Sequence, residues 1–342
     1  MKWSIIIPVY NVEQYLSKCL DSVLRQGWKE DEYEVLLVND GSKDRSLSIC
    51  EQYAEKYHNF RIINQENAGV SAARNNGIEQ SRGEFIGFID SDDYLLDNGF
   101  CLATKPFENR KDIDVISYGS SYDFWEKKNI DNSINFDGTG FDFISKFGLP
   151  SFCWLFFYRK SFLDRYHIRF KKYVVGEDSL FTTSVLLHNP KIASTNANIY
   201  RYVVRDDSAT TRRSKDFARR CVNDYLNSIN DIRLEVQKSN IQSFLNVYTK
   251  FTDIINSKKM FGFSRLMTAD YTKKEYKEII KKCKESSFYP IKSFTPSLKN
   301  RLQCKLMNRT MDNYLFYRIG CVLFNKIIVP FIMPKLRVNL KK

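Results

Sequence analysis

Apolar residues follow two different spacings over the first hundred positions of the chain. Short unbroken apolar runs, rich in β-branched residues and each followed by polar ones, predict buried strands of a parallel sheet. These runs cover positions 4–9, 33–38, 61–63 and 84–89. Apolar residues at helical spacing predict helices in between, over 12–26, from about 42 or 44 to 57, and over 69–80. This order predicts an α/β fold with a mostly parallel, doubly wound sheet.

Polar clusters stand where three of these strands end. Tyr10 and Asn11 follow the first strand, Asn39 and Asp40 follow the second, and an acidic cluster at 90–93 follows the fourth. In doubly wound sheets, ligands bind beyond the carboxyl ends of the strands. We therefore expect a binding site along this edge of the sheet.

The acidic cluster reads Asp90-Ser91-Asp92-Asp93. Carboxylates this close repel one another unless a cation lies between them, and hard oxygen ligands suit Mg²⁺ or Mn²⁺. Aspartate and serine are also ordinary turn and helix-capping residues. The local pattern therefore leaves two interpretations open, a metal site and a capped turn.

Two further residues have both a functional and an ordinary interpretation. Asp40 could accept hydrogen bonds from a base or ribose, or could simply belong to the turn that it forms with Gly41 and Ser42. Arg74 follows the small residues Ser71, Ala72 and Ala73, which would let its helix approach a ligand closely. It could bind a phosphate through two N–H groups, or it could be a solvated helix arginine.

Several enzyme classes are disfavoured by missing motifs. No GxGxxG follows the first strand, and the chain has no GxxxxGK[ST] and no GxSxG, which argues against dinucleotide redox enzymes, P-loop hydrolases and α/β-hydrolases. The eight cysteines are scattered without a CxxC pair, so free buried thiols are expected rather than zinc ligands or disulfides.

Composition and charge add the general character of the chain. Of its 342 residues, 43% are hydrophobic, which is enough for a sizeable core. No apolar stretch is long enough to span a membrane, and the N-terminus lacks signal-peptide features, so a cytoplasmic location is expected. Residues 1–215 carry 28 basic and 30 acidic side chains, whereas 216–342 carry 25 and 10. The basic last third should attract an anionic partner.

Four segments together resemble the family 2 glycosyltransferases. They are Ser4–Asn11, Val38–Asp44, Asn67–Asn75 and Phe88–Asp93, in the family's order and with its gaps. The resemblance is specific over about residues 1–95 and looser to about 215. It implies a GT-A fold, a nucleotide-sugar donor and inversion at the anomeric carbon. Beyond residue 215 we find no motif of the family.

The resemblance also assigns roles to individual residues. The family's nucleotide contacts fall on Pro8, Val9, Tyr10, Asn11, Asp40, Asn67 and Arg74. Its DxD motif is Asp90-Ser91-Asp92, with Asp92 as the direct ligand of a divalent cation, Mn²⁺ or Mg²⁺, and Asp90 beside it.

The second half of the implied site lies further along the chain. The segment Gly176–Phe181 is similar to the family's Glu-Asp motif and makes Asp178 the candidate general base, with Glu177 second. Read without the resemblance, the same pair is an acidic helix N-terminus. The segment 200–211 is similar to one that closes over the diphosphate in related bacterial enzymes, through Arg205 and Ser208.

The chain departs from the family's pattern in two places. Phe156 occupies a position where many relatives have lysine, and Trp154 beside it could either stack on a sugar or belong to the core. No QxxRW motif follows the acidic pair, which argues against a processive synthase and for the addition of a single sugar.

The resemblance implies an inverting enzyme of bacterial cell-surface polysaccharide synthesis, a hexosyl- or N-acetylhexosaminyltransferase. It would move one sugar from a nucleotide-sugar, UDP-linked by analogy, to a hydroxyl group of a glycan or lipid-linked acceptor. Two alternatives share the fold. One is a non-catalytic scaffold that binds nucleotide-sugars, and the other is a sugar nucleotidyltransferase, whose usual glycine-rich phosphate loop is absent here.

We expect a catalytic domain over 1–215, with a donor half to about 95 and an acceptor half from 96, and a helical basic region over 216–342. That region contains predicted helices over 217–234 and 241–255 and a linker over 286–296. Its tail mixes aromatic, aliphatic and basic residues. It could lie on an anionic membrane, which would make the protein peripheral on the inner face, or pack on the catalytic domain. No nucleic-acid-binding module is present, so no nucleic-acid partner is expected.

Overall fold

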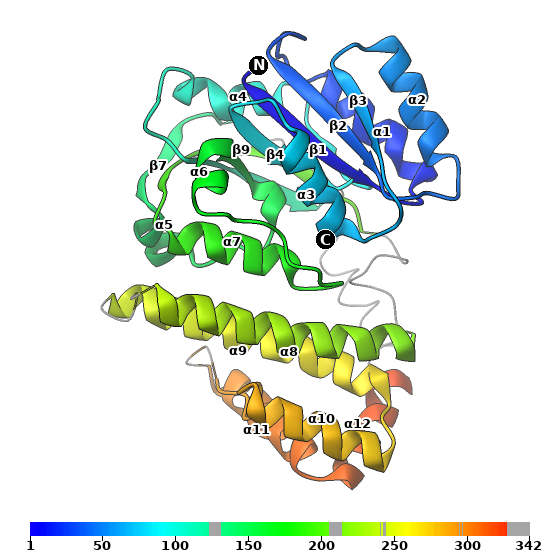
Figure 1. Ribbon diagram of the computed structural model, residues 1–342. Helices are drawn as coiled ribbons and strands as arrows, with labels where there is room; N and C mark the ends of the chain where they lie inside the picture. Colours follow the sequence, from blue (N-terminus) through cyan, green and yellow to red (C-terminus); the bar gives the residue numbers. More distant parts are fainter. Residues whose placement is uncertain are drawn as a thin grey trace. The chain divides into compact units, whose positions relative to one another are not determined.

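The computed structural model describes residues 1–122, 131–204, 214–239, 241, 244–293, 295 and 297–326 (Figure 1). The chain divides into two compact units. The first unit comprises Met1–Lys172 and Glu177–Val204, and the second comprises Tyr173–Gly176 and Arg205–Lys342.

The first unit is built on one sheet. Its described residues form nine strands in the order β3-β2-β1-β4-β8-β6-β9-β5, with β7 beside β9. The bounds are β1 Trp3–Val9, β2 Tyr33–Asn39, β3 Phe60–Asn64, β4 Phe85–Phe88, β5 Tyr94–Leu95, β6 Val115–Tyr122, β7 Ile134–Thr139, β8 Phe156–Arg159 and β9 Lys191–Tyr202.

The first four strands confirm the predicted α/β class. β1 pairs in parallel with β2 and β4, and β2 pairs in parallel with β3. The connecting helices are α1 Glu13–Leu24, α2 Ser46–Lys56 and α3 Val70–Gln80, close to their predicted bounds. Every residue of β1 and β2 is buried, as continuous apolar runs predict for a sheet covered on both faces.

The other half of the sheet is mixed. β8 runs antiparallel to both β4 and β6, and β9 is parallel to β6 but antiparallel to β5 and β7. The helices here are α4 Gly99–Thr104, α5 Gly140–Phe147, α6 Lys160–Arg165 and α7 Glu177–Leu187, with short 3₁₀ turns at Lys105–Phe107 and Cys153–Leu155. Parallel pairing is therefore concentrated in the half that carries the predicted nucleotide contacts.

Close packing of α3 on β1 holds the two together. A Cβ atom on Gly77 would lie 2.4 Å from Cγ2 of Ile6, so only glycine allows the helix to approach this closely. Aromatic rings fill the other side of the unit, where Trp3 stacks on Trp28 at 4.9 Å. The sheet is thus fixed between a tight helix contact and an aromatic cluster.

The second unit is helical in its described residues, as predicted. Its helices are α8 Lys215–Lys238, α9 Leu245–Ala269, α10 Lys273–Glu285, α11 Leu298–Asp312 and α12 Tyr314–Leu323. In Figure 1, α8 and α9 lie side by side, and their buried residues share one core with α10 and the following segments. The predicted linker at 286–296 coincides with the connection between α10 and α11.

Two further expectations concern the whole chain. All eight cysteines are free thiols, seven of them buried, as their scattered spacing predicts. Among the described residues, every helix is too short or too polar to cross a bilayer.

Candidate active site

The polar clusters at the strand ends meet at one edge of the sheet. Because β1, β2 and β4 are parallel neighbours, Tyr10, Asp40 and Asp90 follow strands that end on the same side. Pro8 and Val9 are buried within β1, and the carbonyl oxygen of Val9 accepts a hydrogen bond from the backbone N–H of Asp40 at 2.9 Å. The predicted edge therefore exists, with the exposed residues beginning at Tyr10.

Asp40 is buried and fixes the loop that leads into α3. Its Oδ1 accepts from the backbone N–H of Ala68 at 2.8 Å and from Nε2 of Gln65 at 2.7 Å, and its Oδ2 accepts from the backbone N–H of Gly69 at 2.9 Å. Gly69 has a φ of +92°, a conformation that glycine adopts readily. Asp40 thus determines how the 65–69 loop is presented to the edge of the sheet.

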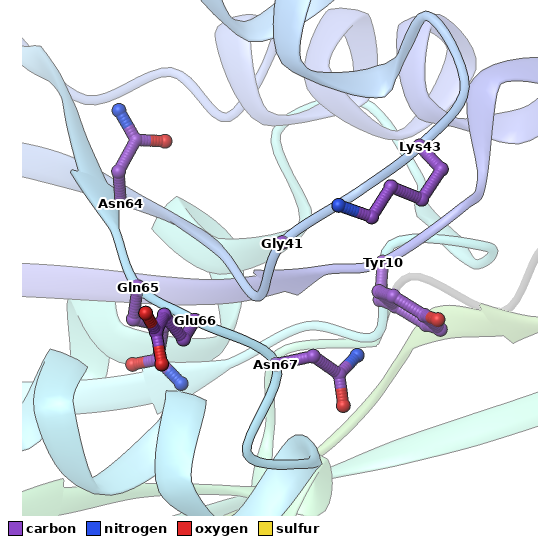
Figure 2. A pocket seen from close by; sticks show the side chains of 7 residues that line it. All are labelled: Tyr10, Gly41, Lys43, Asn64, Gln65, Glu66 and Asn67. Carbon is purple, nitrogen blue, oxygen red and sulfur yellow. The ribbon is translucent and has the colours of Figure 1, made fainter.

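An open cleft of about 580 Å³ lies between the ends of β1 and β2 and this loop. It is lined by Tyr10, Gly41, Lys43, Asn64, Gln65, Glu66 and Asn67 (Figure 2). In Figure 2, Lys43 and Asn67 approach the space beside Gly41 from opposite sides. Asn11 stands beside the cleft with a φ of +50°, and its Oδ1 accepts from the backbone N–H of Lys43 at 2.7 Å.

Arg74 is the centre of a buried ionic cluster. Its Nη1 lies 2.6 Å from Asp178 Oδ1 and 3.3 Å from Glu177 Oε1, and its Nη2 lies 2.8 Å from Asp90 Oδ1. Its side chain is only 3% exposed, and its guanidinium lies over the Phe170 ring. Burial alone would lower the pKa of Arg74, but Asp178 and the other carboxylates raise it well above its usual value. The charges of the neighbouring carboxylates therefore offset the cost of burying this cation.

The acidic pair stands at the first turn of α7. Burial raises the pKa of Glu177 to about 8, with a further contribution from Asp178 and an opposing one from Arg74. These surroundings favour the protonated form of Glu177. Asp178 makes the shorter contact with Arg74, which favours its ionised form.

The end of β4 holds the other acidic residues. Asp90 and Asp92 are half-buried, whereas Ser91 and Asp93 are buried. Asp93 accepts from the Tyr200 hydroxyl and from the backbone N–H of Val203, both at 2.7 Å. Burial, together with the charges of Asp90 and Asp92, raises the pKa of Asp93 well above its usual value. Three acidic side chains are thus crowded together at the end of β4.

The donor chemistry at this position fits a hard divalent cation. Asp90 and Asp92 offer carboxylate oxygens two residues apart, both half-buried and next to the buried Asp93. Among the described residues, no group of three or more histidine, cysteine or acidic side chains could enclose a metal. Mg²⁺ and Mn²⁺ need no such enclosure, because one or two carboxylates, water and substrate phosphates can complete their coordination.

Not every sequence-derived candidate can be placed. Arg205 and Ser208 lie outside the described residues. Trp154 belongs to the core, since it is 3% exposed and packed between aromatic rings. Phe156 is buried as well, so the position that carries lysine in many relatives presents no side chain to the surface here.

Three residues near the cluster were not among the sequence-derived candidates. The Cys153 thiol is hydrogen-bonded to Asp178, and burial raises the pKa of that thiol well above its usual value. The Tyr200 hydroxyl accepts from the backbone N–H of Asp90 at 3.1 Å while it donates to Asp93. Gln65 binds Asp40. Each of these residues contacts a candidate residue that is distant in the sequence, and no local sequence pattern reveals such a contact.

Comparison with known proteins agrees with this arrangement. Residues 4–166 match the family model described as Glycosyl transferase family 2. The chain is 36% identical over 221 residues to glycosyltransferase GlyA of Streptococcus pneumoniae, an alignment that covers 60% of this chain and 31% of GlyA. It is 34% identical over 212 residues to a poly(ribitol-phosphate) beta-glucosyltransferase of Bacillus spizizenii, covering 60% and 33% of the two chains. The chain thus spans about a third of the length of these relatives.

A third relative and the solved structures extend the comparison. The uncharacterized glycosyltransferase YibD of Escherichia coli is 31% identical over 222 residues, covering 61% of this chain and 63% of YibD. Residues 1–349 of Staphylococcus aureus TarS, in complex with UDP, superpose with a TM-score of 0.66 at 22% identity, over 95% of this chain and 92% of that one. A Pyrobaculum calidifontis mannosyltransferase in complex with GDP-Man and Mn²⁺ gives a TM-score of 0.54 at 14% identity, over 95% and 87%.

The solved structures confirm the expected fold, since TarS superposes over 95% of this chain with a TM-score of 0.66. The family model covers the strand ends at which the cleft and the acidic cluster at 90–93 lie. Together these findings confirm the resemblance seen in the sequence: residues 4–166 form a family 2 glycosyltransferase domain, and the chain has the GT-A fold.

Proposed function

We propose that the chain transfers one sugar from a UDP-sugar to a hydroxyl group of a glycan acceptor in cell-surface polysaccharide synthesis, with inversion at the anomeric carbon. The observation that carries this proposal is the Arg74 cluster, in which one guanidinium binds both Asp90 and Asp178. Asp90, a candidate metal ligand, and Asp178, the candidate base, are thereby held next to the same guanidinium. A TarS structure that contains UDP supports the donor class, and a relative named as a beta-glucosyltransferase supports the transfer of a sugar.

The donor's nucleotide would occupy the cleft beside Tyr10. This ring is 47% exposed and can stack on a base, while Lys43 can reach a phosphate and Asn67 offers an amide. Asp40 would act through the backbone of the 65–69 loop, because that loop already uses both of its carboxylate oxygens. Asp92 and Asp90 would hold a Mg²⁺ or Mn²⁺ ion, whose Lewis acidity stabilises a leaving diphosphate when it is bound.

Asp178 would act as the general base. It would take the proton of an acceptor hydroxyl while that oxygen attacks the anomeric carbon from the face opposite the nucleotide. Glu177 is less suited to this role because its raised pKa favours the protonated acid. Arg74 would orient Asp178 and keep it ionised, and it would balance the charge of Asp90.

We further propose that the first unit, with the residues up to about 215, is the catalytic domain and that the second unit attaches it to an anionic membrane on the cytoplasmic face. The helices α11 and α12 expose a set of apolar side chains, each at least 47% exposed: Leu298, Leu302, Leu306, Leu315, Phe316, Ile319, Val322 and Leu323. Lys299, Arg301, Lys305 and Arg309 are exposed on α11 beside them. Apolar and basic side chains together suit binding to anionic lipid.

Binding to vesicles tests the membrane proposal. A Leu302→Glu/Leu306→Glu variant should lose most of its partition onto phosphatidylglycerol vesicles, with Leu234→Glu on α8 as a control of similar apolar exposure. Equal partition of both variants would rule out this face as the binding surface.

The catalytic proposal is tested by two substitutions that preserve side-chain shape. With Mn²⁺ and a panel of UDP-sugars, Asp178→Asn should lower the rate of UDP release about 10²- to 10⁴-fold with little change in donor affinity. Glu177→Gln should keep most of the activity, because glutamine resembles the protonated acid. Full activity of Asp178→Asn would refute the assigned base.

The two alternatives give different results in the same assay. A non-catalytic scaffold would bind a UDP-sugar without releasing UDP under any condition. A nucleotidyltransferase would release pyrophosphate from UTP and a sugar 1-phosphate.

A further inference from the structure

An exposed aromatic ring stands at the end of a buried stack beside the acidic pair. The Phe152 ring is 47% exposed and lies on Trp154, with centroids 4.9 Å apart and planes 20° apart. Tyr200 also stacks on Trp154, at 4.0 Å and 11°. Tyr202 stacks on Trp154 as well, at 6.3 Å and 18°. Phe152 is the exposed ring of this stack, whereas Trp154 and Tyr200 are buried.

Both ends of this stack are tied to the candidate active site. On one side, the Tyr200 hydroxyl donates to Asp93 and accepts from the backbone N–H of Asp90. Trp154 and Tyr200 are almost fully buried, so the rings on which Phe152 packs are held in place by the core. The exposed face of Phe152 thus has a fixed place relative to the end of β4.

On the other side, α7 holds the segment that carries Phe152. The Thr182 hydroxyl donates to the carbonyl oxygen of Pro150 at 2.9 Å, and the Ser179 hydroxyl donates to that of Ser151 at 3.5 Å. The residue after Phe152 is Cys153, whose thiol is hydrogen-bonded to Asp178. Phe152 is therefore the immediate chain neighbour of a residue that contacts the candidate base.

An aromatic face of this kind suits one class of acceptor. The C–H groups on one face of a sugar ring form a flat apolar surface that packs on an aromatic ring, whereas a linear polyol phosphate has no such surface. The segment 150–156 offers little else to an acceptor, because Trp154 and Phe156 are buried.

We propose that Phe152 forms an acceptor subsite that binds the ring of a terminal sugar, so that the acceptor is a glycan ending in a sugar ring rather than a polyol phosphate chain. This inference rests on the proposed function, since it places the acceptor next to Asp178. It assigns the acceptor side of the reaction to the surface between the segment 150–153 and the start of α7.

Binding of methyl glycosides measures this subsite without the need for turnover. With UDP present, saturation-transfer NMR on the full chain should detect methyl glycosides of glucose, galactose or N-acetylglucosamine. The Phe152→Ala variant should weaken their binding about 3- to 10-fold, as expected for the loss of an aromatic contact, and Phe152→Trp should restore it. Phe147→Ala is the matched control, because Phe147 is equally exposed and stands on α5.

Turnover gives a second readout. Phe152→Ala should raise the acceptor KM by a similar factor and leave the donor KM unchanged, while the unfolding midpoint should fall only slightly through the loss of one ring contact with Trp154. Unchanged glycoside binding in Phe152→Ala, or binding of glycerol phosphate oligomers in place of glycosides, would overturn the inference. If the wild type released no UDP from any UDP-sugar, the proposed function would fail, while the glycoside measurement would still decide the subsite.

Discussion

Nη1 of Arg74 lies 2.6 Å from Oδ1 of Asp178, although 104 positions separate the two residues in the chain. The same guanidinium reaches Asp90 at 2.8 Å with its other terminal nitrogen. One buried cation on α3 therefore joins the end of β4 to the start of α7. The geometry of both carboxylates depends on this single side chain.

Removal of Arg74 should destabilise the first unit strongly. Arg74→Ala would leave the carboxylates of Asp90 and Asp178 close together without a cation, at a cost of about 3–5 kcal/mol in the free energy of unfolding. Urea unfolding measures this value. In a background of Asp178→Asn the same substitution should cost less, because one of the stranded charges is absent. Equal costs in both backgrounds would show that the contact between Arg74 and Asp178 contributes nothing.

The raised pKa of Glu177 predicts a pH dependence of stability. The folded chain keeps the Glu177 proton up to about pH 8, whereas the unfolded chain releases it near pH 4.5. The free energy of unfolding should therefore fall as pH rises through this window and level off above it. Glu177→Gln cannot ionise, so its stability should fall less between pH 5 and pH 9, by on the order of a few kcal/mol. Urea unfolding at pH 5, 7 and 9 tests this, and parallel curves for the two proteins would contradict it.

Asp40 should affect both stability and nucleotide binding through the 65–69 loop. Asp40→Ala removes the acceptor for two backbone N–H groups and the Gln65 amide, and should cost about 1.5–3 kcal/mol. The freed loop should also weaken UDP binding about tenfold, as measured by calorimetry. Asp44→Ala is a suitable control, since Asp44 accepts backbone hydrogen bonds from Glu13 and Ser46 instead. That control should lose stability and keep its UDP affinity.

Gly77 should tolerate no larger residue. In Gly77→Ala the new Cβ would lie 2.4 Å from Ile6 Cγ2, so α3 must move away from β1, at a cost of about 1–3 kcal/mol. Combining it with Ile6→Ala should make the two costs less than additive, because the smaller partner removes the clash. Strict additivity in urea unfolding would argue against this contact.

Residues 1–95 were well predicted because local patterns determine them. β1 and β2 are continuous apolar runs, and the polar residues that end them stand at the predicted edge. The helix starts were less accurate. The sequence predicts that α2 begins at about 42 or 44, but the helix begins at Ser46. Asp44 accepts a hydrogen bond from the backbone N–H of Ser46 at 3.0 Å. Bounds of this kind depend on contacts with neighbouring elements, here with Glu13 at the start of α1.

The mixed half of the sheet was not resolved by the sequence. β6, β8 and β9 are short or irregular, and β6 and β9 pair with register shifts near Gly119. The two interpretations of Trp154 had equal sequence support, and burial between two aromatic rings decided for the core. Phe152, two residues before it, was not a sequence-derived candidate, because the exposure of a side chain depends on the folded structure.

The sequence by itself determined the α/β class and the edge of the sheet at which Asp40 and Asp90 stand, because the spacing of apolar and polar residues reflects local chain geometry, and the resemblance to the family singled out the acidic pair at 177–178. Tertiary structure alone decided that Arg74 binds Asp90 and Asp178 at once, that burial raises the pKa of Glu177, and that Phe152 is left exposed. The reason is physical. Charge compensation, burial and exposure depend on which distant segments pack together, and that information is not contained in any single stretch of the chain.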